Sequence, residues 1–583
     1  MDRLPLDNRW TALDKLPPPH RLYLRQSYFG WLYGGPRGWR WAGVQQPLDN
    51  RRPPPRHPDL ESGPLKLKDG VIDADLDYLI VGSGPAGSVL GHELSRNGKR
   101  VLIVERGSFV MPGDIDPRLY PELKVGGGAV PTRLSSILVR NGQTVGGGST
   151  VNVDLAFAPT LPFVRDRFEA WRKAGLLPRD QWTIGEVEEA YQWVVETIGT
   201  RTPTAEEINA NNDILRRGAE AVGLVPRLYD LNTLPGRGPA NDKLSATSQL
   251  LLPAMTRKEN PLMVLPDFEV RTLQLEDSRA VGVVGRFRPP WQHPNVWKDP
   301  NKLGHREKET YQIRARNIIL SAGAQGTAAI LLRSGVGGDR VGKGVVLHPS
   351  MPLIGLFPEE IRAHEGTAST IYCVDPPNLL FECMTGDPMY AALMLDGTGE
   401  EVGERVRQFK HLGGFGVLLV DQPVEGNRIM LDDNGEPEVV YQLTESDKSA
   451  LSNGVRRSLQ IMLAAGAREV YLPSSEELLA GEADGHLTTI SNEKEALEVA
   501  SRLQFIPGAT IVTSAHMQST CKLGTSPDTS VVGADLKVWG FENLYVCDSS
   551  VFPTSVGANP MQAIYTVAKM TADRLVKPAT GSR

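Results

Sequence analysis

Hydrophobic and polar positions change their pattern sharply after about residue 70. The runs DYLIV (77–81) and VLIVE (101–105) are continuous and apolar, with the length of buried strands. The segment between them, SVLGHELSRNG, has the spacing of a helix. Two strands joined by a helix form a βαβ unit with parallel strands, so this region predicts the start of an open parallel sheet.

Helical and strand patterns alternate in blocks along the rest of the chain. Helical spacing dominates residues 160–225, and the loop 288–310 reads as an exposed excursion between two strands. The further expected elements are strands at 261–276, 280–287, 311–323, 428–431, 439–443, 536–540 and 542–548, mixed strands over 350–445, a turn at 432–437, and helices at 445–471 and 559–575.

Composition narrows the class of protein. A chain of 583 residues is too long for one core, so two or more domains are expected. Its net charge of −6 indicates no attraction to nucleic acid. Four cysteines form no disulfide framework and no zinc motif, and the longest uncharged apolar run (317–332) is too short to span a bilayer. With no secretory signal visible, we expect a cytoplasmic enzyme without a transmembrane segment.

The N-terminal arm, residues 1–70, differs in composition from the rest of the chain. Its first 56 residues contain ten Lys or Arg against four Asp, and four of the ten tryptophans. One interpretation is a basic aromatic surface for a partner protein or a membrane face. The other is an arm that packs its aromatic side chains onto the body, which is favoured because aromatics interleaved with Pro and Gly do not form an amphipathic helix.

A glycine-rich turn follows the first strand. GSGPAG places Gly82, Gly84 and Gly87 at the spacing of a dinucleotide-binding loop. In such a loop the first glycine permits a tight turn, the second lets the backbone approach a pyrophosphate, and the third allows close helix packing. Glu105 ends the second strand, where it can accept hydrogen bonds from a ribose diol. NAD and FAD both use such a loop. Glu105-Arg106-Gly107 and the strand that delivers Asp548 resemble FAD-binding chains, so FAD is favoured.

Three longer motifs carry a family resemblance. QTVGGGSTVN (143–152), SAGAQGTAAILLRSGVG (321–337) and the tail from His516 to Leu575 resemble the glucose–methanol–choline (GMC) oxidoreductases over residues 75–577. In motif the chain is nearest to the long-chain fatty alcohol oxidase and cholesterol oxidase branches. The resemblance implies an α/β fold, with a Rossmann-like FAD-binding domain and a second sheet-and-helix substrate-binding domain.

The resemblance also divides the chain and assigns cofactor contacts. The expected segments are 71–160, 215–350 and 515–583 for FAD binding, with catalysis in the last, and 161–214 and 351–514 for the substrate domain. The implied cofactor-binding residues are Gly82, Ser83, Gly84, Pro85, Ala86, Gly87, Glu105, Arg106, Val145, Gly146, Gly147, Gly148, Ser149, Asn152, Val270, Asp548, Pro560 and Met561. Val151 stands where covalently flavinylated relatives often have histidine, so non-covalent FAD is expected.

His516 and Asn559 are the candidate catalytic residues. Oxidation of an alcohol removes a hydride, which flavin N5 accepts, and a proton, which a histidine can accept without a large pKa shift. His516 matches the family's catalytic histidine, and Asn559 matches its partner position, whose amide can donate to the substrate oxygen. A metal site at His516 and Cys521 is not expected, because SAHMQSTCKLG offers no third ligand.

Several positions depart from the family pattern or stay open. Thr327-Ala328 replaces the usual Ser-Pro, which we interpret as a mild loosening of a helix start. A cysteine-rich segment typical of fatty alcohol oxidases is missing at 228–242, which argues against a fatty substrate. His348 is expected near the flavin or in a structural hydrogen bond. Glu382 could touch substrate, but a solvent-facing strand residue is the favoured interpretation.

The combined expectation is an FAD-dependent alcohol oxidoreductase. It would convert the CH–OH group of a small-molecule alcohol to a carbonyl and pass electrons to O2 or another acceptor. A non-redox flavoprotein on the same fold, a lyase or decarboxylase, keeps the same cofactor site and stays as the alternative. A protein that keeps FAD only as structure is a third possibility, against which the paired His516 and Asn559 argue.

Overall fold

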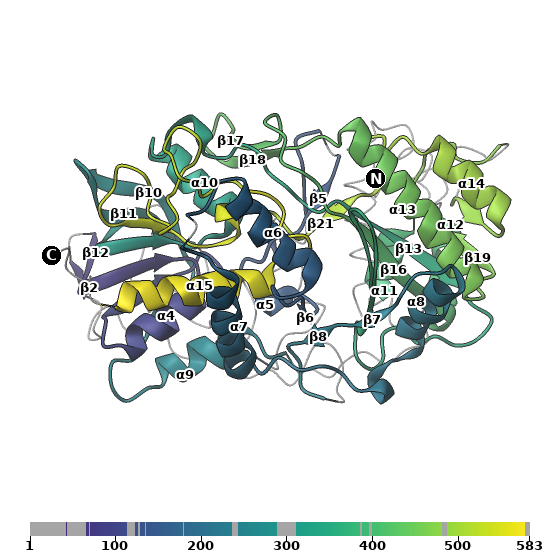
Figure 1. Ribbon diagram of the computed structural model, residues 1–583, viewed down its shortest axis with the longest axis horizontal. Helices are drawn as coiled ribbons and strands as arrows, with labels where there is room; N and C mark the ends of the chain where they lie inside the picture. Colours follow the sequence, from purple (N-terminus) through teal and green to yellow (C-terminus); the bar gives the residue numbers. More distant parts are fainter. Residues whose placement is uncertain are drawn as a thin grey trace, which may run out of the picture.

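Two large sheets lie at opposite ends of the molecule, and helices pack against each of them (Figure 1). The computed structural model describes residue 42 and residues 66–577, with gaps at 69, 113–122, 126–128, 135, 179, 236–242, 289–309, 385–387, 396–398 and 481–486. The N-terminal arm, apart from residue 42 and its last few positions, and the loop 288–310, apart from its two ends, therefore lie outside the described residues.

The first sheet is built on parallel strands. β2 (Val71–Val81) lies between β3 (Val101–Val104) and β12 (Tyr311–Leu320), and β9 (Met263–Leu265) follows β3. β22 (Leu544–Val546) pairs in parallel with the far side of β12. All four residues of β3 are buried, as a strand covered on both faces requires. The predicted βαβ unit is thereby confirmed, with α4 (Pro85–Arg96) as its helix.

Antiparallel strands extend this sheet on one side, and helices cover it. The expected strands at 261–287 form β9, β10 (Phe268–Glu276) and β11 (Arg279–Phe287), and β1 (Lys66–Lys68) pairs with β2. α15 (Met561–Val576) packs against α4 and against α7 (Ile184–Ile198), as Figure 1 shows. The remaining helices of this half are α5 (Gly148–Val151), α6 (Pro162–Lys173), α9 (Leu252–Met255) and α10 (Gly323–Arg333).

The second sheet is mainly antiparallel. Its order is β4 (Val130–Pro131), β5 (Leu138–Val139), β21 (Thr513–Ser514), β13 (Ser350–Leu356), β16 (Leu412–Leu419), β15 (Leu379–Cys383), β14 (Ile371–Asp375) and β7 (Arg227–Leu228). β19 (Glu469–Tyr471) also pairs with β13, and β20 (Thr489–Ile490) pairs with β19. α8 (Ala210–Ala221) and α13 (Glu445–Ala464) pack on it, and α14 (Glu493–Arg502) packs on α13. Small two-stranded units pair β17 (Arg428–Leu431) with β18 (Pro437–Val440), and β6 (Leu155–Ala156) with β8 (Asp230–Leu231).

Local signals explain where several helices begin. Thr183 and Glu186 exchange side chain and backbone hydrogen bonds at the start of α7, and Thr444 and Asp447 do the same for α13. Each capping box satisfies amide groups that have no partner within the helix. α13 ends at Ala464, because Gly466 then adopts a φ of +95° and the chain turns into β19.

Three predicted elements differ from the structure. Residues 465–471 are not helical, since β19 is held in the second sheet by β13. The strand predicted at LKVWG (536–540) is wrong, because only isolated bridges form there, from Lys537 to Tyr545 and from Val538 to Val532. Within the mixed strands predicted for 350–445, the structure has two helices, α11 (Pro388–Met394) and α12 (Gly399–Arg407).

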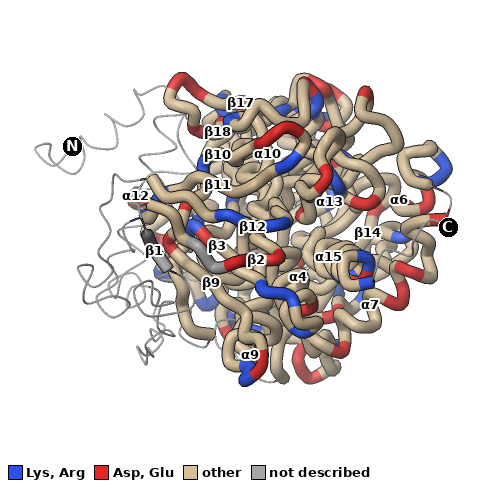
Figure 2. Tube along the Cα trace, turned by 90° about the vertical axis from the view of Figure 1, so that its left-hand side faces the viewer, with Lys and Arg blue, Asp and Glu red and all other residues tan. Residues whose placement is uncertain are grey.

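Charges on the side drawn in Figure 2 are interspersed by sign. Red positions on β2 lie beside blue positions on β12, where Arg316 forms ion pairs with Asp75 and Asp77. In the described part of the chain, none of the helices combines the length and the apolar character that crossing a membrane requires.

The division of the chain into FAD-binding and substrate-domain segments stays a prediction. Three short strands from segments assigned to FAD binding, β4, β5 and β7, hydrogen-bond within the second sheet. Parts of these segments therefore contribute strands to the second sheet.

Candidate functional site

The first glycine loop lies at the carboxyl end of β2. A Cβ on Gly82, whose φ is +101°, would lie 2.3 Å from the carbonyl oxygen of Ser321. A Cβ on Gly87 would lie 2.0 Å from the carbonyl oxygen of Gly82, so the predicted tight turn and close helix packing are both present. Gly84 is different, because no atom lies within 4 Å of its Cβ position. Pro85 begins α4, whose first amide groups face the loop.

The second glycine loop packs directly on the first. The Gly146 N–H donates to Ser83 Oγ at 3.1 Å, and a Cβ on Gly147 would lie 2.8 Å from Gly84 Cα. Ser149 Oγ donates to the carbonyl of Gly146 at 2.7 Å and so closes the turn. Gly148, like Gly84, has open space where a side chain would stand. Val145 is fully buried beneath the loop.

Glu105 holds the first loop in place. Its Oε2 accepts hydrogen bonds from the N–H and Oγ of Ser83, at 3.1 and 2.8 Å, and its Oε1 accepts from the Gly107 N–H at 2.8 Å. Burial raises the pKa of this carboxyl, opposed by these hydrogen bonds. A carboxylate has about four acceptor positions, so it retains capacity for a ribose hydroxyl. The neighbouring Arg106 is half-buried.

Val270 lies on β10 at an irregular register. The pairing with β11 shifts between Val270 and Thr272, which marks a bulge. A bulge leaves backbone groups outside the ladder, and Val270 itself is 5% exposed. Backbone groups left outside the ladder can form hydrogen bonds with a ligand.

Asp548 follows β22 and joins two segments of the first half. Its Oδ2 accepts from Thr327 Oγ1 at 2.6 Å and from the Gly323 N–H at 3.0 Å. Its Oδ1 accepts from the Ser550 N–H at 2.8 Å. The expectation that Thr327 loosens a helix start is wrong, because α10 begins at Gly323 and Thr327 is its fifth residue. The Thr327 hydroxyl instead orients the Asp548 carboxylate.

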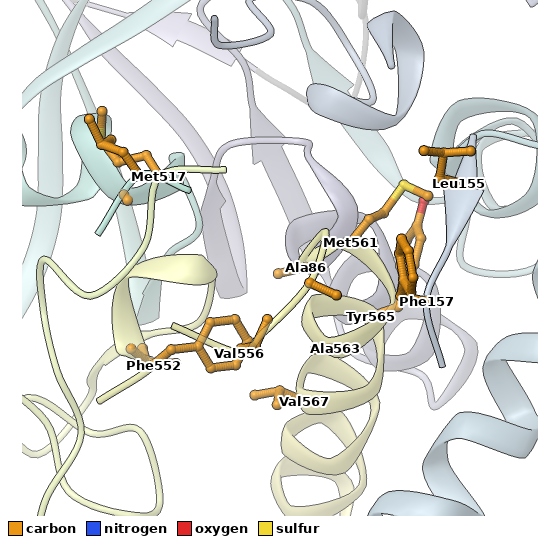
Figure 3. Packing of buried hydrophobic residues seen from close by; sticks show 14 of the residues in the cluster. Ala86, Leu155, Phe157, Met517, Phe552, Val556, Met561, Ala563, Tyr565 and Val567 are labelled. Carbon is orange, nitrogen blue, oxygen red and sulfur yellow. The ribbon is translucent and has the colours of Figure 1, made fainter. Parts of the chain in front are cut away.

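Asn152 lies against the start of the last helix. Its Nδ2 approaches Met561 Sδ at 3.0 Å, and Pro560 is the residue before α15 begins. Figure 3 shows Met561 and Tyr565 on α15, with Leu155 and Phe157 beside them and Ala86 of the first glycine loop close by. The structure thus brings together three predicted cofactor-site regions that are far apart in sequence.

His516 lies next to His348, with 5.4 Å between their ring centroids. His516 Nδ1 is buried, and no described residue offers it a hydrogen-bond partner. Burial lowers the pKa of His516 to about 4. His348 is fully buried; its Nε2 contacts Ser555 Oγ, and Gln518 Nε2 lies 3.3 Å from the same nitrogen. Gln518 also accepts from the Val556 N–H, which ties the His516 segment to the one that ends at Asn559.

Asn559 contacts Glu382, which the sequence placed on the solvent side. Asn559 Nδ2 lies 3.4 Å from Glu382 Oε2, while Glu382 Oε1 and Asn559 Oδ1 are buried without partners in the described residues. Burial raises the pKa of Glu382 to about 7, opposed by the contact with Asn559. The interpretation of Glu382 as a solvent-facing strand residue is therefore wrong. The available signal was its position within the apolar run LLFEC.

Comparison with known proteins decides the family. Two family models, both described as GMC oxidoreductase, match residues 76–350 and 423–568. This chain is a GMC oxidoreductase. The predicted family, the α/β fold class and an oxidoreductase acting on a CH–OH group are thereby confirmed.

Individual relatives of this GMC oxidoreductase are distant but cover most of it. Long-chain-alcohol oxidase FAO4A of Arabidopsis thaliana is 26% identical, over 93% of this chain and 74% of the relative. Among solved structures, pyridoxine 4-oxidase from Mesorbium loti superposes with a TM-score of 0.61 at 18% identity, over 86% of this chain and 99% of the other. A formate oxidase gives 0.62 at 15% identity, over 87% and 98%.

The cofactor of this family fits the two glycine loops. Membership supports FAD as the cofactor, and the residues present accommodate it. The open Cβ positions of Gly84 and Gly148 leave room for a ligand beside each loop. Within the described residues, no cluster of three or more His, Cys, Asp or Glu side chains could hold a metal ion.

Two further residues near the site were not predicted from the sequence of this GMC oxidoreductase. Asp154 and Lys243 form a buried ion pair next to Asn152. Nothing in the sequence around Lys243 marks it as buried, because the pocket that holds it comes from residues about ninety positions earlier.

Proposed function

We propose that this GMC oxidoreductase oxidises an alcohol to a carbonyl compound, with His516 as the base that takes the hydroxyl proton. The observation that supports the proposal is the state of His516, a half-buried imidazole whose Nδ1 is buried and has no hydrogen-bond partner in the described chain. It lies in a segment that hydrogen bonds join to the Asn559 segment.

The lowered pKa keeps His516 ready to accept a proton. With a pKa of about 4, the imidazole is neutral at neutral pH, which is the form a base requires. The same shift makes it a weak base toward an intact alcohol. As the hydride leaves the carbon, the hydroxyl becomes strongly acidic, so proton transfer becomes favourable at that stage.

Asn559 supplies the second polar contact. Its amide cannot act as a base but can donate to the substrate oxygen as negative charge develops there. Its contact with Glu382 orients the amide, because the carboxyl can draw Nδ2 toward itself. The unpartnered Glu382 Oε1 leaves one further acceptor in the same region.

Non-covalent FAD completes the proposed site. When bound, FAD supplies the acceptor for the substrate hydride. The chain would hold it through the two glycine loops, Glu105, the Val270 backbone, Asp548 and the start of α15. Val151, which precedes Asn152, packs beside Leu123 and has no atom that could form a covalent link.

The relatives suggest which substrates to test first. The curated relative is named a long-chain-alcohol oxidase, which favours an alcohol as substrate and O2 as acceptor. The missing cysteine-rich segment argues against a fatty chain. A cytoplasmic location and a partner surface on the N-terminal arm stay predictions.

An anaerobic visible spectrum tests the oxidation directly. The purified protein is mixed with aliphatic, aryl, sterol and sugar alcohols, and we expect one class to remove the flavin absorbance near roughly 450 nm. Readmitted air should restore the colour if O2 is the acceptor. A flavin that no alcohol bleaches would contradict the proposal and favour the non-redox alternative.

His516→Ala tests the base. We expect the rate of bleaching by the best alcohol to fall about 10²- to 10⁴-fold while FAD stays bound. In the unaltered protein the rate should fall only as pH approaches about 4, where His516 takes up a proton. His411→Ala is the matched control, since this histidine contacts the Glu359 carbonyl in the second half of the molecule. An unchanged rate in His516→Ala would rule out this assignment.

A further inference from the structure

A buried lysine contacts the residue that faces the start of α15. Lys243 Nζ lies 3.0 Å from Asn152 Oδ1 and also contacts the Asn152 carbonyl oxygen. It forms an ion pair with Asp154 Oδ2 at 3.2 Å, and the two side chains are 3% and 2% exposed. A lysine this deeply buried is rare unless it is paired.

The lysine fixes which end of the Asn152 amide points outward. An ammonium group only donates, so the amide oxygen must face Lys243. The Asp154 N–H also donates to this oxygen, at 3.3 Å. The NH2 end is therefore turned away from both, toward Met561 at the start of α15.

Backbone hydrogen bonds also hold Asp154 and Lys243 next to each other. Asp154 has a positive φ of +63°, a conformation that non-glycine residues adopt only where their surroundings impose it. Its carbonyl accepts from the Asn232 N–H, and the Asn232 carbonyl accepts from the Leu244 N–H, directly after Lys243. The two charged residues are thus joined by their neighbours as well as by their side chains.

We propose that Lys243 is a positioning residue of the redox site, which holds the Asn152 amide with its NH2 end toward the flavin. This inference rests on the FAD site proposed above. A donor aimed at the cofactor stabilises its electron-rich reduced form more than its oxidised form. An amide free to rotate would also present its oxygen there, which repels added negative charge.

The effect of the Lys243 charge can be distinguished from its effect on the position of the Asn152 amide. Burial shifts the pKa values of both Lys243 and Asp154. Burial raises the pKa of Asp154 to about 7 and lowers the pKa of Lys243. When the lysine is removed, the carboxyl can take up a proton, which limits the charge left unpaired. Lys243→Met in an Asp154→Asn background removes both charges and keeps the shape of the site.

The test measures the bound flavin without any alcohol. Lys243→Met is compared with the unaltered protein for its dissociation constant for FAD and for its midpoint potential, by chemical reduction against a reference dye. We expect FAD binding to weaken about tenfold to a hundredfold, as for the loss of a hydrogen bond to a charged group, and the potential to fall. Because no substrate is used, failure of the proposed alcohol oxidation would not affect this result.

A double-mutant cycle with Asn152→Ala shows whether Lys243 acts through the amide. We expect Lys243→Met to change the potential little once Asn152 is absent, so the two effects are not additive. Lys569→Met is the matched control, because this half-buried lysine on α15 pairs with Glu93 at 3.0 Å and its loss should lower only the unfolding temperature. Additive effects, or an unchanged potential, would overturn the proposal. If Lys243→Met fails to fold, the Lys243→Met/Asp154→Asn protein answers the same question.

Discussion

The two glycine loops and the His516 region make their contacts by different means. In the loops, backbone meets backbone: Gly147 lies against Gly84, and Gly87 against Gly82, with no room for a side chain. Around His516 and Asn559, the contacts are between single side chains: His516 lies beside His348, and Asn559 contacts Glu382 of β15. A backbone contact restricts which residue type can stand at a fixed position in a motif. A contact between side chains depends instead on how segments far apart in the sequence fold together.

After His516→Ala, the largest effect should come from Asn559, whose contact depends on a single side chain. Asn559→Ala removes the proposed donor to the substrate oxygen, so we expect kcat to fall about 10²- to 10³-fold with FAD still bound. Stopped-flow reduction by the best alcohol measures the change. Asn453→Ala on the exposed side of α13 is the control. Loss confined to FAD binding would assign Asn559 to the cofactor instead.

Gly87 tests the backbone side of the comparison. A Cβ there would overlap the Gly82 carbonyl, so Gly87→Ala should lower the free energy of unfolding by about 3 kcal/mol and release FAD. Gly185→Ala is the matched control, because that helical glycine has no atom within 4 Å of its Cβ position. Urea unfolding and flavin content per protein report both. Equal stability of the two variants would show that the loop adjusts freely.

Thr327 combines backbone and side-chain contacts, because its hydroxyl orients the Asp548 carboxylate, which also accepts from the Gly323 N–H. Thr327→Val keeps the shape but removes the donor to Asp548, and we expect a loss of about 1.5–2 kcal/mol in unfolding free energy, with weaker FAD binding. Thr327→Ser restores the hydroxyl and should recover most of the loss. No recovery in the serine protein would mean that packing of the methyl group matters more.

Glu382 should give the smallest effect, and one that depends on pH. Its pKa is about 7 in the folded protein, above the ordinary value of a glutamate, so folding favours the protonated form. Stability from this group is present below about pH 4.5 and is lost as pH rises toward 7.

The neutral variant Glu382→Gln should remove that decline. We expect it to be more stable than the unaltered protein at about pH 8, by about 1 kcal/mol, as thermal unfolding across pH would show. Glu425→Gln, at an exposed glutamate, is the control. If the stability of Glu382→Gln and of the unaltered protein changed with pH in the same way, the pKa of Glu382 would not be raised by folding.

The same contrast explains what the sequence could reveal. Gly82 and Gly87 were predictable because a turn and a close helix approach restrict those positions to glycine. α7 was predictable from its helical spacing, and its Thr183–Glu186 cap is a local signal. Glu382 and Lys243 were not, because the burial of a charged residue is decided by segments far along the chain. Residues 465–471 were mistaken for helix since pairing with β13, a non-local contact, determines them.

The placement of β12 between β2 and β22 bears on how the protein is made. β2 leaves the ribosome long before β22, Asp548 and α15, because most of the described chain separates them. Until β22 is made, the sheet under the glycine loops is incomplete, and the edge of β12 at residues 318–320 is open to other chains. Cofactor loading therefore belongs after translation, and a polypeptide cut before residue 544 would lack both the closing strand and the carboxylate that follows it.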